Sequence, residues 1–168
     1  MSILINDATR IVAQGITGNQ GRFDTKLALA YGARVVAGMT PGRGGETVYD
    51  VPVYDTVLHA VTETGADAAV LYVPAGGVRD AVVEAVEAGC KVILATAENV
   101  PRHDAVHAVA VARNANAWLV GFNTNDLISP GKCKLGGIGG NNPMRSITPV
   151  GLVWFPARAA CRPRFPGP

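Results

Sequence analysis

The stretch RIVAQGITGNQG, residues 10–21, decides the fold. Its first half is a short, mostly apolar run, as expected for a strand buried on both faces of a parallel sheet. Glycines follow at GxxGxxG spacing, and glycine lets a backbone turn tightly and approach a ligand. A helix predicted over Asn19–Tyr31 would point free N–H groups into that turn, which suits an anion. A tight turn without a ligand needs the same glycines, so the motif alone does not establish binding.

Short apolar runs and helical patterns continue to alternate along the chain. The further predicted strands are Arg34–Met39, Ala68–Val73, Lys91–Ala95 and Trp118–Phe122. The further predicted helices are Thr56–Thr64, Val78–Ala88 and Arg102–Asn114. This alternation predicts an α/β fold with a doubly wound parallel sheet, that is, a Rossmann-like domain. Ligands of such sheets bind at the carboxyl ends of the strands, so the candidate site lies there.

Length and composition narrow the class of protein. A chain of 168 residues with 48% hydrophobic residues fits a single domain with one sizeable core. The longest apolar run is well short of the roughly 20 residues of a membrane span, and the N-terminus does not resemble a secretory signal. We therefore expect a cytoplasmic protein without a membrane partner. Cys90, Cys133 and Cys161 are too scattered for a disulfide framework or a zinc site, so no metal is expected.

The end of the second predicted strand bears on the choice of cofactor. NAD-binding domains place Asp or Glu there to hold the ribose hydroxyls. This chain instead continues as TPGRGG, residues 40–45, where glycines flank Arg43. A guanidinium suits a ribose phosphate, which both NADP and CoA carry. A solvated loop arginine is the alternative explanation.

Several blocks together resemble the α subunit of succinate–CoA ligase (succinyl-CoA synthetase). They occur in the order and spacing of that family over about residues 1–135. The blocks are QGITGNQG at 14–21, GMTPGRGG at 38–45, YVP at 72–74, AENVP at 97–101, GFN at 121–123 and ISPGKCK at 128–134. The resemblance implies a CoA-binding domain, which with a C-terminal linker would cover residues 1–149.

The same resemblance implies which residues contact CoA. The family's pyrophosphate turn falls on residues 17–20, and Arg43 stands where the family commonly has a CoA-contacting lysine. The full implied set is Thr17, Gly18, Asn19, Gln20, Arg43, Val73, Pro74, Thr96, Ala97 and Glu98. Two segments depart from the family. Residues 121–126 read GFNTND instead of GPNCPG, and residues 136–143 replace the family's GHIHKP insert, which leaves the acid substrate open.

The resemblance also implies an activity and a partner. The family is a nucleoside diphosphate-forming acid–CoA ligase of the tricarboxylic acid cycle, whose α subunit joins a β subunit in a heterodimer or heterotetramer. Its phosphorylated histidine lies in a second α-subunit domain. His59, His103 and His107 do not match that motif, so no catalytic residue is assigned and the chain alone is expected to be inactive. An NADP-binding oxidoreductase domain and a stand-alone CoA-binding regulatory module are the alternative functions.

The end of the chain has a different character. After Asp126 there is no acidic residue and the net charge is +6, but the segment lacks the aromatic interleaving of a nucleic-acid-binding domain, so no nucleic acid is expected. Reading back-translated residues 148–167 one frame over gives PGRIGVVSRSGGMSAEIS, which resembles the family's continuation GKVGIVSRSGTL. We therefore expect residues 150–168 to be an out-of-frame, poorly structured tail. A genuine disordered tail is the alternative.

Overall fold

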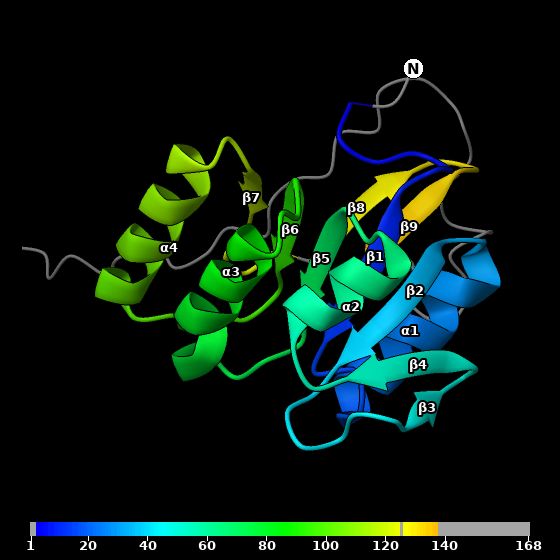
Figure 1. The fold of residues 1–168 in the computed structure, drawn as a ribbon. Helices are drawn as coiled ribbons and strands as arrows, with labels where there is room; N and C mark the ends of the chain where they lie inside the picture. Colours follow the sequence, from blue (N-terminus) through cyan, green and yellow to red (C-terminus); the bar gives the residue numbers. More distant parts are fainter. Residues whose placement is uncertain (1–2, 125, 138–168) are drawn as a thin grey trace, which may run out of the picture.

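A computed structural model of the protein describes residues 3–124 and 126–137. Its main feature is a seven-stranded sheet in the order β3-β4-β2-β1-β5-β6-β7 (Figure 1). All neighbouring strands are parallel except β3, which pairs antiparallel with β4. The strands are β1 Arg10–Gln14, β2 Arg34–Met39, β3 Thr47–Val48, β4 Val51–Tyr54, β5 Ala68–Leu71, β6 Val92–Ala95 and β7 Trp118–Val120.

Helices cover both faces of this sheet. They are α1 Asn19–Tyr31, α2 Val57–Thr64, α3 Val78–Glu87 and α4 Arg102–Asn114, with a short 3-10 turn at Ala75–Gly77 before α3. Alternate residues of each strand enter two separate cores. In β5, for example, Ala69 and Leu71 pack with α2, α3 and α4, whereas Ala68 and Val70 pack on the side of α1. Figure 1 shows these helices on opposite sides of the strands. The predicted doubly wound sheet is confirmed.

Every strand and helix expected from the sequence is present, with strand ends up to two residues shorter than predicted. Two hairpins were not expected. The β3–β4 turn consists of Tyr49 and Asp50, whose φ angles are 53° and 63°. Glycine usually supplies the positive φ of a two-residue hairpin turn, and this turn contains none, so the sequence did not indicate it. The second hairpin joins β8 Asp126–Ser129 to β9 Cys133–Gly136 through residues 130–132, and the Lys132 N–H closes the turn on the Ser129 carbonyl at 2.9 Å. A Pro-Gly pair is the usual choice for a type II turn.

The second hairpin changes how the basic C-terminal stretch is understood. Cys133 and Leu135 of β9 are buried in the same core as Ala28 of α1, so the hairpin covers the sheet face beside that helix. Lys134, counted above as part of a basic segment, is fully buried. The expected tail at residues 150–168 lies outside the described residues and stays a prediction. Within the described part of the chain, no helix is long and apolar enough to cross a membrane.

Glycines fix the course of the chain from β1 into α1. Gly15 has φ +77° and donates its N–H to the Met39 carbonyl of β2, 2.7 Å away. A Cβ on Gly21, in the first turn of α1, would collide with the Gly15 carbonyl oxygen and come within 2.9 Å of Ile16 Cα. The helix therefore starts in direct contact with the turn, which only a residue without a side chain permits.

Replacing Gly21 with alanine tests this constraint. We expect Gly21→Ala to lower the free energy of unfolding by about 1–3 kcal/mol, the usual cost of an overpacked site, although alanine has the better helix propensity. Urea denaturation followed by circular dichroism measures the change. The control is Gly76→Ala, because a Cβ on Gly76 meets no atom within 4 Å. Equal stability of the two variants would contradict the close packing.

Candidate functional site

The β1–α1 turn presents unpaired backbone donors at the carboxyl end of β1. Gly18 is the N-cap of α1, its backbone is extended, and no side chain caps the helix there. The N–H groups of a first helical turn have no partner within the helix and carry its positive dipole end. The Gly18 N–H donates to the Gly15 carbonyl at 3.0 Å within the turn, whereas Asn19 and Gln20 are exposed, so their backbone donors face solvent; Thr17 beside them is half-buried. The turn can therefore bind an anion through its backbone.

A pair of threonine hydroxyls joins this turn to the loop after β2. Thr40 donates its hydroxyl to the Met39 carbonyl at 2.8 Å, so its oxygen accepts from the Thr17 hydroxyl at 3.1 Å. The Thr40 carbonyl in turn accepts from the Arg43 N–H at 3.2 Å. The two loops that the sequence singled out therefore meet at the carboxyl ends of adjacent strands.

Arg43 itself is exposed and paired within its own loop. Its Nε donates to Glu46 Oε1 at 2.8 Å, and the two side chains are 45% and 40% exposed. An ion pair this exposed contributes little to stability and exchanges readily. An anion that reaches Arg43 would compete with Glu46 for the guanidinium or use its free Nη groups. The sequence did not anticipate this internal partner.

The remaining predicted residues lie at the same edge of the sheet. Val73 and Pro74 follow β5, the strand on the other side of β1 from β2. Thr96, after β6, donates its hydroxyl to the Leu71 carbonyl of β5 at 2.9 Å, with Ala97 half-buried and Glu98 exposed beyond it. The chain reverses its winding at β1, between β2 and β5, and ligands of doubly wound sheets bind at that switch point.

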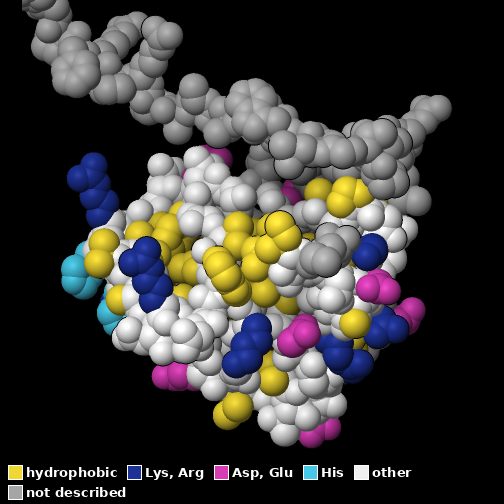
Figure 2. Space-filling view, turned by 90° about the horizontal axis from the view of Figure 1, so that it is seen from above, with side chains coloured by type: hydrophobic (Ala, Val, Ile, Leu, Met, Phe, Trp, Pro, Cys, Tyr) yellow, Lys and Arg dark blue, Asp and Glu magenta, His cyan; other side chains and the backbone are white. Residues whose placement is uncertain are grey.

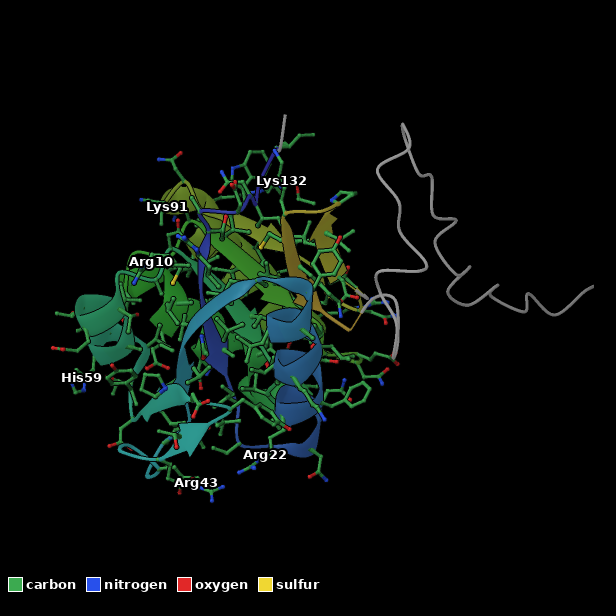
Figure 3. The ribbon with its side chains drawn as sticks, turned by 90° about the vertical axis from the view of Figure 1, so that its right-hand side faces the viewer. Arg10, Arg22, Arg43, His59, Lys91 and Lys132 are labelled. Carbon is green, nitrogen blue, oxygen red and sulfur yellow. The ribbon has the colours of Figure 1, made fainter. Side chains whose placement is uncertain are left out.

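Sequence reasoning missed Arg22, one helical turn beyond Gly18. Its Nε donates to the Thr17 carbonyl at 3.1 Å, and the side chain is exposed. Figure 3 shows Arg22 and Arg43 at the same end of the molecule, with Arg10, Lys91 and Lys132 at the opposite end. Arg22 directly follows the last glycine of the GxxGxxG motif, and this position is the sequence signal that could have indicated it.

A buried polar cluster lies behind the turn, between α1 and the β8–β9 hairpin. Asp24 is 2% exposed and accepts from the Gln20 Nε2 at 2.7 Å. Burial raises the pKa of Asp24 and, to about 7, the pKa of Asp126, while the Gly137 N–H and Lys134 partly offset the latter. Burial lowers the pKa of Lys134, against the attraction of both carboxylates. Lys134 Nζ forms no hydrogen bond with any described residue.

Tyr72, directly after β5, belongs to the same cluster. Burial, with Asp24 and Asp126 nearby, raises its pKa well above the usual value.

The histidines lie elsewhere and are exposed. His59 stacks edge-on against Tyr54 at 5.0 Å between ring centroids, and His103 Nδ1 is 3.9 Å from an Asp104 oxygen. Among the described residues, no group of three or more His, Cys, Asp or Glu is placed to hold a metal ion.

The fold and the donor-rich strand ends define a nucleotide-binding α/β domain. The sequence profile of the CoA binding domain matches residues 6–99, more than half of the chain. The chain therefore belongs to the CoA-binding domain family, and the predicted relationship to the α subunit of succinate–CoA ligase is confirmed.

Known proteins show how far the similarity extends. The chain is 48% identical over 136 residues to succinate–CoA ligase [ADP-forming] subunit alpha 2 of Archaeoglobus fulgidus, covering 81% of this chain and 47% of that one. It is 44% identical over 138 residues to succinate–CoA ligase [ADP-forming] subunit alpha of Aquifex aeolicus, covering 81% of this chain and 45% of that one. The chain thus spans about half the length of these curated relatives. ATP citrate lyase of Methanothrix soehngenii, solved with citrate and coenzyme A, shares the fold, with TM-score 0.72 and 19% identity over 82% of this chain and 24% of that one.

The raised pKa of Asp126 makes stability depend on pH. The folded-state pKa of about 7 exceeds the ordinary value of 3.8. Between these two pH values the folded protein therefore keeps a proton on Asp126 that the unfolded chain loses. The stabilisation is complete below about pH 4 and lost as the pH rises through about 7. The free energy of unfolding of the wild type should therefore fall from pH 5 to pH 8. Asp126→Asn removes one titrating proton, so it should make the slope of that fall shallower by up to about 1.4 kcal/mol per pH unit.

Urea denaturation at several pH values measures the slope. Asp24 shifts in the same direction, so the Asp126→Asn variant should keep a smaller slope rather than none. Asp50→Asn, at an exposed turn position with positive φ, is the control and should leave the slope unchanged. A wild-type slope retained in Asp126→Asn would show that Asp126 is not the titrating group.

Proposed function

We propose that this domain binds coenzyme A at the carboxyl ends of β1, β2, β5 and β6. One observation carries the proposal: the uncapped start of α1 and the Arg43 loop are joined by the Thr17–Thr40 hydrogen bond into one donor-lined edge. Family membership supports CoA as the ligand of that edge. The residues proposed to contact it are Thr17, Gly18, Asn19, Gln20, Arg43, Val73, Pro74, Thr96, Ala97 and Glu98.

Each part of CoA has a proposed place. The diphosphate lies over residues 17–20, because the backbone donors of Asn19 and Gln20 stand there at the positive end of the α1 dipole. The ribose phosphate lies near Arg43, whose guanidinium matches phosphate geometry. Val73 and Pro74 form an apolar wall after β5, and Thr96–Glu98 form the next segment along the edge.

We further propose that the domain works within a nucleoside diphosphate-forming acid–CoA ligase. Support comes from relatives of twice its length that are called α subunits of succinate–CoA ligase. In such an enzyme, a β subunit and a second α-subunit domain supply the phosphorylation chemistry. We propose the cytoplasm as the location of this enzyme. The role of this domain is to hold CoA so that its thiol can attack the activated acid.

Calorimetric titration with CoA, NADP and NAD tests the ligand. We expect CoA to bind measurably, and NADP and NAD to bind more weakly or not at all. Stronger binding of NADP would favour the alternative oxidoreductase domain. Binding of CoA but not of NADP or NAD, together with no acyl-CoA formation when the 168 residues are combined with a ligase β subunit and the C-terminal half of a ligase α subunit, would favour a regulatory module.

Arg43→Ala should weaken CoA more than dephospho-CoA. The two ligands differ only in the ribose phosphate, so the ratio of their affinities isolates the contact made by the guanidinium. Because Arg43 is exposed and already paired with Glu46, we expect a three- to tenfold loss for CoA. Equal weakening of both ligands in calorimetry would show that Arg43 does not bind the ribose phosphate.

The 168 residues by themselves should not catalyse the ligase reaction. His59, His103 and His107 are exposed on helices α2 and α4, which do not form the strand-end site. We therefore expect neither acid-labile phosphate after incubation with a labelled nucleoside triphosphate nor acyl-CoA after addition of succinate. Labelled phosphate on any of these histidines, located by mass spectrometry, would contradict the proposal.

A further inference from the structure

Arg22 is held against the proposed diphosphate site by its own turn. The residue stands in the first turn of α1, where its N–H donates to the Gly18 carbonyl at 2.9 Å. Its side chain folds back so that Nε donates to the Thr17 carbonyl at 3.1 Å. This bond uses one edge of the guanidinium and leaves the Nη groups available. An arginine held in this way loses less freedom when it binds an anion than a freely rotating one does.

A series of hydrogen bonds connects the two arginines of the site. Arg22 binds the Thr17 carbonyl, the Thr17 hydroxyl binds the Thr40 hydroxyl, and the Thr40 carbonyl accepts from the Arg43 backbone. Figure 3 places both arginines at the end of the molecule where the strands finish. Both guanidinium groups are therefore attached to the loops that form the strand-end site.

The two arginines differ in whether a carboxylate neutralises the guanidinium. Arg43 is neutralised by Glu46 at 2.8 Å. No carboxylate of the described residues lies within ion-pair distance of Arg22. Asp24, two residues further along α1, is buried and bound to Gln20 instead. The charge of Arg22, beside the β1–α1 turn, is therefore not offset by a described carboxylate before a ligand arrives, which favours a phosphate there.

We propose that Arg22 is a second phosphate-binding side chain of the site and contacts the diphosphate of CoA. The proposal rests on CoA binding at the β1–α1 turn as proposed above. The diphosphate is assigned because Arg22 is attached to that turn, whereas Arg43 belongs to the neighbouring loop. Backbone N–H groups and the Arg22 fork then bind the same anion from two directions.

The test compares Arg22→Gln, Arg22→Lys and Arg10→Gln by calorimetry with CoA and dephospho-CoA. Arg10 is a matched control, because its Nε also donates to a backbone carbonyl, that of Thr64 at 2.7 Å, but at the opposite end of the molecule (Figure 3). We expect Arg22→Gln to weaken both ligands by the same three- to tenfold factor at low salt. The factor should shrink at 0.5 M salt as screening increases. Arg22→Lys should recover part of the loss, and Arg10→Gln should bind like wild type.

Several outcomes would overturn the inference. Wild-type affinity of Arg22→Gln for both ligands would remove Arg22 from the site. A loss for CoA alone would assign Arg22 to the ribose phosphate instead. A loss independent of salt, with no recovery in Arg22→Lys, would show that the hydrogen bond to Thr17 matters and the charge does not. Absence of CoA binding by the wild type would instead refute the proposed function itself, so the two failures are distinguishable.

Discussion

The hydrogen bond from Gly15 N–H to the Met39 carbonyl, 2.7 Å long, holds the β1–α1 turn against β2, and the turn is equally tight on its other side. There a Cβ on Gly15 would collide with the Tyr72 carbonyl oxygen after β5. The turn is thus enclosed between both neighbours of β1, at the point where the sheet changes winding direction. Helix α1 can begin in that space only because Gly21 lacks a side chain. The backbone N–H groups proposed to bind the ligand are placed at this edge because the glycine turn and the start of α1 fit between β2 and β5.

The distribution of charge follows from this arrangement. Basic residues occur at both ends of the molecule, so their number does not mark the site (Figure 3). The end at which the strands begin shows hydrophobic side chains in its centre, with Lys and Arg around them (Figure 2). What distinguishes the strand-end site is that backbone donors and guanidinium groups belong to the same two loops, joined through Thr17 and Thr40. The backbone donors among them are fixed by the turn and favour an anion without reorganisation of the loops.

Much of the fold could be predicted because the central strands are continuous apolar runs and helices α1 and α2 end at glycines. Gly32 and Gly65 have φ 93° and 64°, the left-handed conformation expected after a helix. Prediction failed where a turn used untypical residues, as at Tyr49 and Asp50. It also failed for Arg22, because whether an exposed arginine bends back onto its own turn depends on three-dimensional geometry. The buried cluster combines residues more than one hundred positions apart, and no local pattern indicates such contacts.

The buried cluster determines what Gln20 can offer to a ligand. Its Nε2 donates one of its two hydrogens to the Asp24 carboxylate at 2.7 Å, which fixes the orientation of the side-chain amide. Gln20 can therefore offer an anion its backbone N–H and the second hydrogen of Nε2, while the same side chain connects the turn to the cluster of Asp24, Asp126 and Lys134. The β8–β9 hairpin, by bringing Lys134 and Asp126 beside α1, thus supports the turn from behind without touching the ligand face.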